Sequence, residues 1–97
     1  MLRIGVLQFT IEIPHAASLK DKRRVVKSMR DRIRRNFNVS IAETEDLNEW
    51  TVATLGAVMA GTDVAYVNGA LDKLINALEN ERDAILIDNQ IEIISPA

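Results

Sequence analysis

The apolar residues of this chain change their spacing abruptly near position 14, which limits the folds open to it. In the preceding stretch every second residue is apolar: Leu7, Phe9, Ile11 and Ile13. That period of two is typical of a half-buried strand. Ile4 and Val6 add apolar groups on the opposite face, and Pro14 removes a ladder donor. We therefore predict a strand over residues 2–13.

A helix with a divided surface follows. Ser18 and Asp21 have the spacing of a capping box. The apolar side chains then recur at helical spacing on one side: Leu19, Val26, Met29, Ile33 and Phe37. Most of the basic ones lie on the other side: Lys20, Arg23, Arg24, Lys27, Arg30, Arg34 and Arg35. The spacing predicts an amphipathic helix that ends near residues 36–38.

A hairpin and a second helix are expected next. Alternating residues at 39–42 lead into an acidic turn, and a β-branched stretch over 50–59 supplies the second strand. Gly61 breaks that pattern, and Thr62 or Asp63 can cap a helix whose apolar period continues through Gly69. An Asn-Gly pair is also a strong turn signal, so a break there is the alternative.

The last apolar stretch completes the order βαββαβ. Four isoleucines share one face of a final strand: Ile85, Ile87, Ile91 and Ile93. Asp88-Asn89 could instead bend this segment into a small hairpin. We predict one α+β domain over residues 1–97, with a ferredoxin-like fold and two helices on one face of a four-stranded antiparallel sheet. The apolar groups on both faces of the first strand indicate that the open sheet face is partly covered, by a second copy or by a partner.

Positive charge is concentrated on the first predicted helix. Nine of the twelve Lys and Arg residues fall within residues 18–36, against two acids, for a local charge of +7. The rest of the chain carries −9, although the formal net charge is only −2. Such a patch attracts anionic partners and steers their encounter. A solvated face that keeps the protein in solution, or pairing with the acidic remainder, is the alternative, but such faces usually interleave acids with bases.

Two of these bases stand apart from the basic face. Lys22 and Arg32 lie off its main arc, with Lys22 close to the apolar side. We expect these two side chains to run along apolar surface and reach solvent at the sheet edge. The alternative is a hook for a phosphate or carboxylate near the helix start.

No catalytic or metal-binding constellation is apparent, and we expect a non-enzymatic protein without cofactors. The chain has no cysteine and one histidine, His15, which we expect in an exposed loop. We interpret four nearby carboxylates as a solvated hairpin tip, with weak cation binding as the alternative: Glu43, Glu45, Asp46 and Glu49. Trp50 is expected to pack under the hairpin, the alternative being a contact with a base or a partner. No apolar stretch is long enough to span a bilayer, and we expect a cytoplasmic protein without membrane contact.

The chain resembles the YlxP-like family of small bacterial proteins over essentially its whole length. The resemblance is carried by Ile13-Pro14, SLKDKR at 18–23, VSIAE at 39–43, Trp50, ATLG at 53–56 and IEII at 91–94. It implies a ferredoxin-like domain of unknown function. Members are often encoded beside translation initiation factor 2 and ribosome-binding factor A, which implies a role near translation or ribosome assembly. The resemblance brings no catalytic residues.

The sequence therefore favours a binding protein for RNA or a ribosomal subunit. Its phosphate contacts would come from Lys20, Arg23, Arg24, Lys27, Arg30, Arg34 and Arg35. The alternative is a protein-interaction module that forms a homodimer through its open sheet face or docks on an acidic partner. A small-ligand sensor ranks last, because no ligand-binding loop can be identified.

Overall fold

Six elements follow one another in the predicted order βαββαβ. The structure is a computed structural model and describes residues 1–96. Its elements are β1 (Arg3–Glu12), α1 (Leu19–Asn36), β2 (Ser40–Glu45), β3 (Val52–Gly61), α2 (Val64–Glu79) and β4 (Ile85–Ile94). The molecule is 46 Å long and 23 by 21 Å across.

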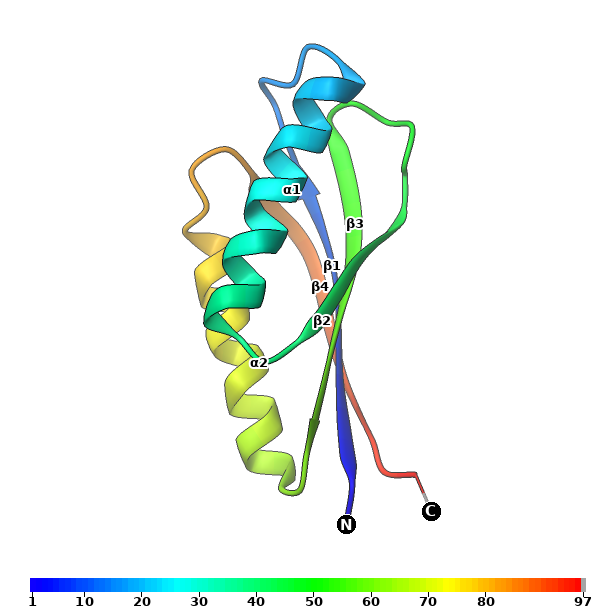
Figure 1. The fold of residues 1–97 in the computed structure, drawn as a ribbon, viewed down its shortest axis with the longest axis vertical. Helices are drawn as coiled ribbons and strands as arrows, with labels where there is room; N and C mark the ends of the chain where they lie inside the picture. Colours follow the sequence, from blue (N-terminus) through cyan, green and yellow to red (C-terminus); the bar gives the residue numbers. More distant parts are fainter. Residues whose placement is uncertain (97) are drawn as a thin grey trace.

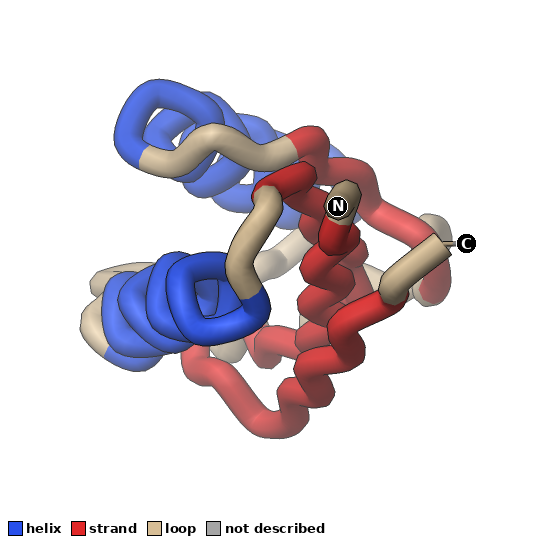
Figure 2. Tube along the Cα trace, turned by 90° about the horizontal axis from the view of Figure 1, so that it is seen from below, coloured by secondary structure: helices blue, strands red, loops and turns tan. Residues whose placement is uncertain are grey.

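The strands form one antiparallel sheet in the order β2-β3-β1-β4. Both helices lie on the same side of it, and no helix or strand of residues 1–96 covers the other side (Figures 1 and 2). Helix α2 packs over β1 and β4, while α1 contacts β2. This arrangement confirms the predicted ferredoxin-like α+β fold.

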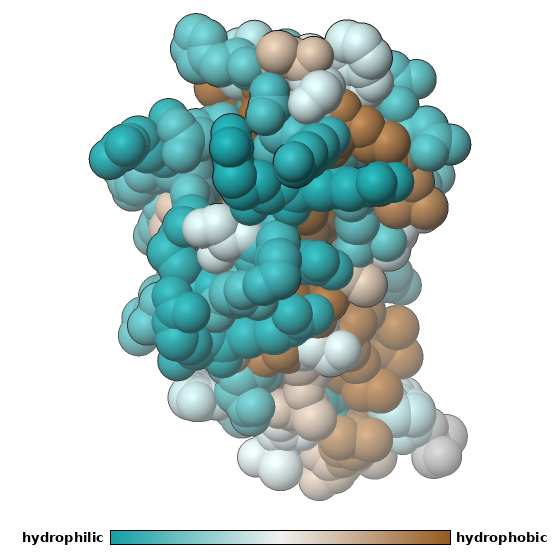
Figure 3. All heavy atoms as spheres, turned by 45° about the horizontal axis from the view of Figure 1, so that its top comes forward, coloured by the Kyte–Doolittle hydropathy of each residue, from teal (hydrophilic) through white to brown (hydrophobic). Residues whose placement is uncertain are grey.

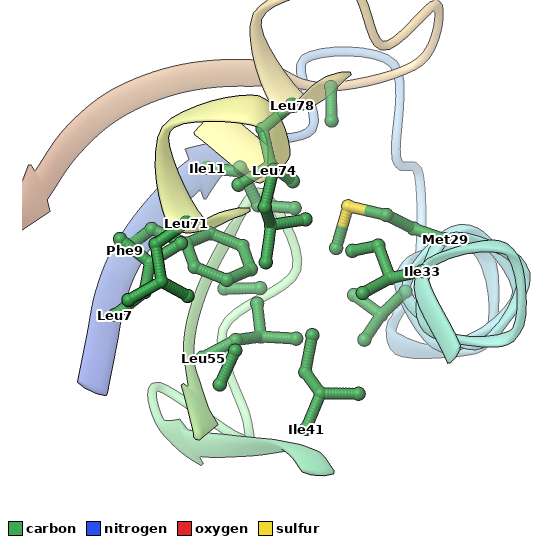
Figure 4. Packing of buried hydrophobic residues seen from close by; sticks show 14 of the residues in the cluster. Leu7, Phe9, Ile11, Met29, Ile33, Ile41, Leu55, Leu71, Leu74 and Leu78 are labelled. Atoms are coloured by element: carbon green, nitrogen blue, oxygen red, sulfur yellow. The ribbon is translucent and has the colours of Figure 1, made fainter. Parts of the chain in front are cut away.

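The core lies between the sheet and the two helices. Strand β1 contributes Leu7, Phe9 and Ile11, and Ile13 follows directly after it; all four are almost completely buried. From α1 come Val26, Met29 and Ile33, and from α2 Val67, Leu71, Leu74 and Leu78. Figure 4 shows Met29 and Ile33 pointing toward the leucines of α2 and toward Ile41 of β2. The apolar stripe of α1 is thus fixed in the core, and its basic face is turned outward.

Both helices begin at the predicted capping residues. The Ser18 hydroxyl accepts a hydrogen bond from the Asp21 backbone N–H at 3.1 Å. The Asp21 carboxylate accepts from the Ala17 N–H, one residue earlier than a capping box requires. Asp63 caps α2, which continues without interruption through Gly69. The alternative of a turn at Gly69 is therefore wrong.

The last strand confirms one prediction and corrects another. It is a single strand, as expected, but its four isoleucines do not share a face. The pairing of β4 with β1 shifts register between Thr10 and Ile11, which inserts one extra residue into β4. Ile91 and Ile93 pack against the core, whereas Ile85 and Ile87 are 53% and 49% exposed. Leu86 takes the inward place beyond the bulge.

The close approach of α2 to β1 gives a stability prediction. A Cβ atom at Gly5 would lie 2.4 Å from Val67 Cγ1 and 2.9 Å from Leu71 Cδ1. We expect Gly5→Ala to lower the free energy of unfolding by about 1–3 kcal/mol, because the added methyl overpacks this contact. Urea denaturation measures the change.

Gly56→Ala is the matched control, because its Cβ would meet only Thr44 Cγ2 at an ordinary 3.5 Å. We expect it to change the free energy of unfolding by less than about 1 kcal/mol. Equal losses in the two variants would contradict the packing argument.

Candidate nucleic-acid interface

The outward face of α1 presents a continuous row of bases. The helix has 18 residues and is therefore about 27 Å long. All seven predicted contact residues are on it, six of them exposed and Arg30 half-buried: Lys20, Arg23, Arg24, Lys27, Arg30, Arg34 and Arg35. Figure 3 shows hydrophilic side chains gathered over this helix, with hydrophobic ones mainly to the right. From here on, these seven residues are called the basic face.

The basic face is only partly neutralised by acids of the same helix. Asp21 lies 3.4 Å from Arg24, and Asp31 lies 2.9 Å from Lys27 and 3.6 Å from Arg34. Within residues 1–96, the other four members have no carboxylate within salt-bridge distance: Lys20, Arg23, Arg30 and Arg35. The face therefore carries a clear excess of positive charge.

Asp31 responds to this excess. The hydrogen bond from Lys27 holds the pKa of the Asp31 carboxyl below its ordinary value, opposed by partial desolvation. The charges of Lys27, Arg34 and Arg35 lower it further. The carboxylate stays ionised to lower pH than usual, and it pairs directly with Lys27 and Arg34.

Arg34 also has a structural contact. Its Nη2 donates to the Ile41 carbonyl oxygen of β2 at 3.0 Å, while about half of the side chain stays exposed. Because β2 is one of the two edge strands of the sheet, this bond links α1 to the sheet edge. The remaining donors of the guanidinium can still contact a ligand.

Lys22 corrects the expectation that its ammonium group reaches solvent. The residue is fully buried, with Nζ 2.9 Å from Glu43 Oε2. Nζ also donates to the Asp46 backbone carbonyl. The reason is the position of Glu43, which pairs with Leu55 on the core side of the sheet and so places its carboxylate beneath α1. For Lys22 the alternative of a phosphate hook is equally wrong, because its ammonium is not accessible to solvent.

The buried ammonium is connected to the opposite side of the sheet. Asp46, which has a positive φ of 62°, accepts a hydrogen bond from the Thr54 hydroxyl at 2.9 Å. The Thr54 oxygen lies 3.1 Å from that of Thr10. Since Thr54 has a single hydroxyl proton, Thr10 must be the donor to it. A chain of polar groups thus runs from α1 past the β2–β3 connection to the open face.

Arg32 is held by partners within the protein. Its Nη2 lies 2.6 Å from Glu81 Oε2, and its Nη1 donates to Ser28 at 2.7 Å. Glu81 follows α2, so this ion pair joins α1 to the end of the other helix. Like Lys22, Arg32 bonds to other parts of the protein and so holds α1 in place. This agrees with the sequence analysis, which placed both residues outside the basic face.

The remaining candidate residues are mostly exposed. As predicted, the carboxylates of Glu45, Asp46 and Glu49 are exposed to solvent, but Glu43 is half-buried and pairs with Lys22. No group of His, Asp and Glu suited to holding a metal occurs among residues 1–96. His15 is exposed, as predicted. Trp50 is 54% exposed, so the expectation that it packs under the hairpin is wrong.

The fold and the charged helix define a small ferredoxin-like α+β protein whose first helix carries bases on its outward face. The model of the family described as "Protein of unknown function (DUF503)" matches residues 4–91, and the chain belongs to this family. That membership is compatible with the narrower YlxP-like resemblance. No curated protein matches the chain. Across residues 1–96, neither helix combines the length and the apolar character needed to cross a bilayer.

The ion pair of Lys22 predicts a large stability effect. Lys22→Met leaves the Glu43 carboxylate and the Asp46 carbonyl without their partner, and breaking a buried pair in this way typically costs about 3–5 kcal/mol. We expect Lys22→Met with Glu43→Leu to recover part of that loss, because the unpaired carboxylate is removed. Urea unfolding of the four proteins of the double-mutant cycle measures the coupling, and additive losses would contradict it.

The surroundings of Asp31 predict a titration result. We expect Lys27→Met to raise the Asp31 pKa toward its ordinary value of 3.8, because the main hydrogen bond is lost. Since the folded-state pKa is lowered, the interaction is present above the ordinary pKa and disappears as pH falls through the lowered one. Carbon-detected NMR of the carboxyl group measures both values. An unchanged pKa would show that Lys27 is not the cause.

Proposed function

We propose that this protein binds structured RNA through the basic face of α1 and acts by binding, not by catalysis. The observation that carries the proposal is a group of four bases on a rigid helix that have no carboxylate partner among residues 1–96: Lys20, Arg23, Arg30 and Arg35. A helix about 27 Å long can follow several successive phosphates. The planar fork of Arg suits bidentate phosphate contact, and Arg is the commoner base on this helix.

Contacts of this kind supply affinity with little sequence readout. A base-stacking platform on the open sheet face is not part of the proposal, because β3 has no aromatic residue over Val52–Gly61. Ribosomal RNA is the source that the YlxP-like resemblance suggests. Within the proposal, the protein would leave ribosomal subunits as salt is raised, since released counterions drive such binding.

Charge reversal on the basic face tests the proposal. We expect Arg23→Glu with Lys27→Glu to weaken binding to a structured RNA by at least about tenfold at low salt, because two phosphate contacts become repulsive. Both side chains are exposed, so the fold should persist, which circular dichroism checks. Fluorescence anisotropy of a labelled RNA measures the affinity.

The matched control is Arg3→Glu with Arg82→Glu, which changes net charge equally with two bases outside α1. We expect a much smaller loss of affinity from this pair. Equal losses would point to net charge and not to the basic face. Undiminished binding by the Arg23/Lys27 variant would overturn the proposal.

The open sheet face supports a second candidate, a homodimer. Val58 and Ile94 are each 41% exposed there, and Val6 and Val58 line a hollow of about 530 Å³ on the same face. Apolar groups left in solvent favour association. We expect analytical ultracentrifugation to detect a dimer that Val58→Glu dissociates, and a strict monomer at high concentration would remove this candidate.

A further inference from the structure

A groove lies where α1 stops short of α2. Helix α1 ends at Asn36, and the N-terminal half of α2 extends beyond it along the sheet (Figure 1). The groove between them has a volume of about 370 Å³. A second hollow of about 310 Å³ adjoins it and shares the lining segment 36–39. This volume is in the range of small-molecule sites.

The wall that α2 gives to the groove contains an unexplained glycine. Gly69 lies in the middle of α2, where glycine costs about 1 kcal/mol relative to alanine. Its φ is not positive, and nothing lies within 4 Å of the position a Cβ would take. Neither backbone conformation nor packing within residues 1–96 requires a glycine here. A methyl group at this position would project into the groove.

The groove offers an aromatic surface and one side-chain amide. Tyr66 is 67% exposed on its wall, and Phe37 and Met59 form an apolar floor. Asn38 also lines the groove, and its side chain has no hydrogen-bond partner within residues 1–96. An exposed aromatic ring with a nearby amide is suited to stack on a flat heterocycle and to hydrogen-bond its edge.

The charged side chains that line the groove favour an anionic ligand. The two hollows are lined by three bases, Arg34, Arg35 and Lys73, and by no carboxylate. Arg34 and Arg35 are also the last members of the basic face, so the groove begins where that face ends. A phosphate chain that follows α1 would therefore arrive at the groove.

We propose that the groove accepts one unpaired nucleotide of the RNA that lies along the basic face. Its base stacks on Tyr66, with Asn38 at its edge, and its phosphate contacts Arg35 and Lys73. This inference rests on the proposed function and deepens it, because it names RNA with a bulged or looped-out base as the preferred class of ligand. The absence of a side chain at Gly69 leaves the space for the base.

Two RNAs of equal length test the inference, a perfect hairpin and the same hairpin with one unpaired nucleotide in its stem. We expect anisotropy titrations to show about 5- to 160-fold tighter binding of the bulged RNA, the range that stacking of one base provides. Tyr66→Ala should abolish this preference. Tyr66→Phe should keep it, because the ring remains.

Gly69→Ala separates the groove from fold stability. We expect this variant to have a higher melting temperature than the parent, as alanine favours the helix, and yet to lose most of the preference for bulged RNA. Asn76→Ala is the matched control. It replaces an exposed residue of α2 outside the groove with the same better helix former, and it should keep the preference.

The outcomes distinguish this inference from the proposed function. Equal binding of both RNAs, still weakened by Arg23→Glu with Lys27→Glu, would overturn the nucleotide groove and leave the basic face intact. Binding of neither RNA would overturn both. A concentration-dependent oligomer that Tyr66→Ala dissociates, without preference for bulged RNA, would show that a second copy occupies the groove and would overturn the inference.

Discussion

The buried ion pair between Lys22 and Glu43 is the interaction on which the orientation of the basic face depends. An apolar side chain could fill the same space, and buried ion pairs often add little net stability. The ammonium adds a constraint on the position of α1, because its partners within residues 1–96 are the Glu43 carboxylate and the Asp46 carbonyl. This fixes the rotation of α1 about its axis near its start. The contacts of Arg32 and Arg34 do the same further along the helix.

The nine bases of α1 therefore divide into two groups with different tasks. Lys22 and Arg32 serve the fold, and Arg34 does so in part. The other bases lie on one outward face. Their positive charges repel one another, and the two acids of the helix, Asp21 and Asp31, relieve this repulsion only in part. In the proposed RNA complex, a rigid helix would hold the backbone positions of these bases on one face before the ligand arrives, which lowers the cost of ordering on binding.

The elements of the fold were predictable from sequence because their signals are local. The change from period two to helical spacing, the capping residues Ser18 and Asp63, and the unbroken period through Gly69 each lie within one element. The β4 bulge was not predictable, because it arises from the pairing of β4 with β1 and the sequence around Ile87 has no local signal for an extra residue. Alternation alone placed all four isoleucines on one face.

The basic face could likewise be predicted from the sequence. The contacts that hold α1 in place, and the groove beside its end, could not. The burial of Lys22 depends on a carboxylate 21 positions later in the chain, which helix periodicity cannot reveal. The groove depends on where α1 ends relative to α2. A partial signal was present, because Tyr66, Gly69 and Lys73 have the spacing of one helix face, but without α1 beside them they indicate only an exposed surface.

The most direct test of the central claim is the salt dependence of RNA binding. If four to seven bases of α1 contact phosphates, the slope of log K against log salt should be about −3 to −6. Neutralising one of them, as in Arg23→Gln, should reduce the slope by about one. A slope near zero, or a slope unchanged in that variant, would contradict the account.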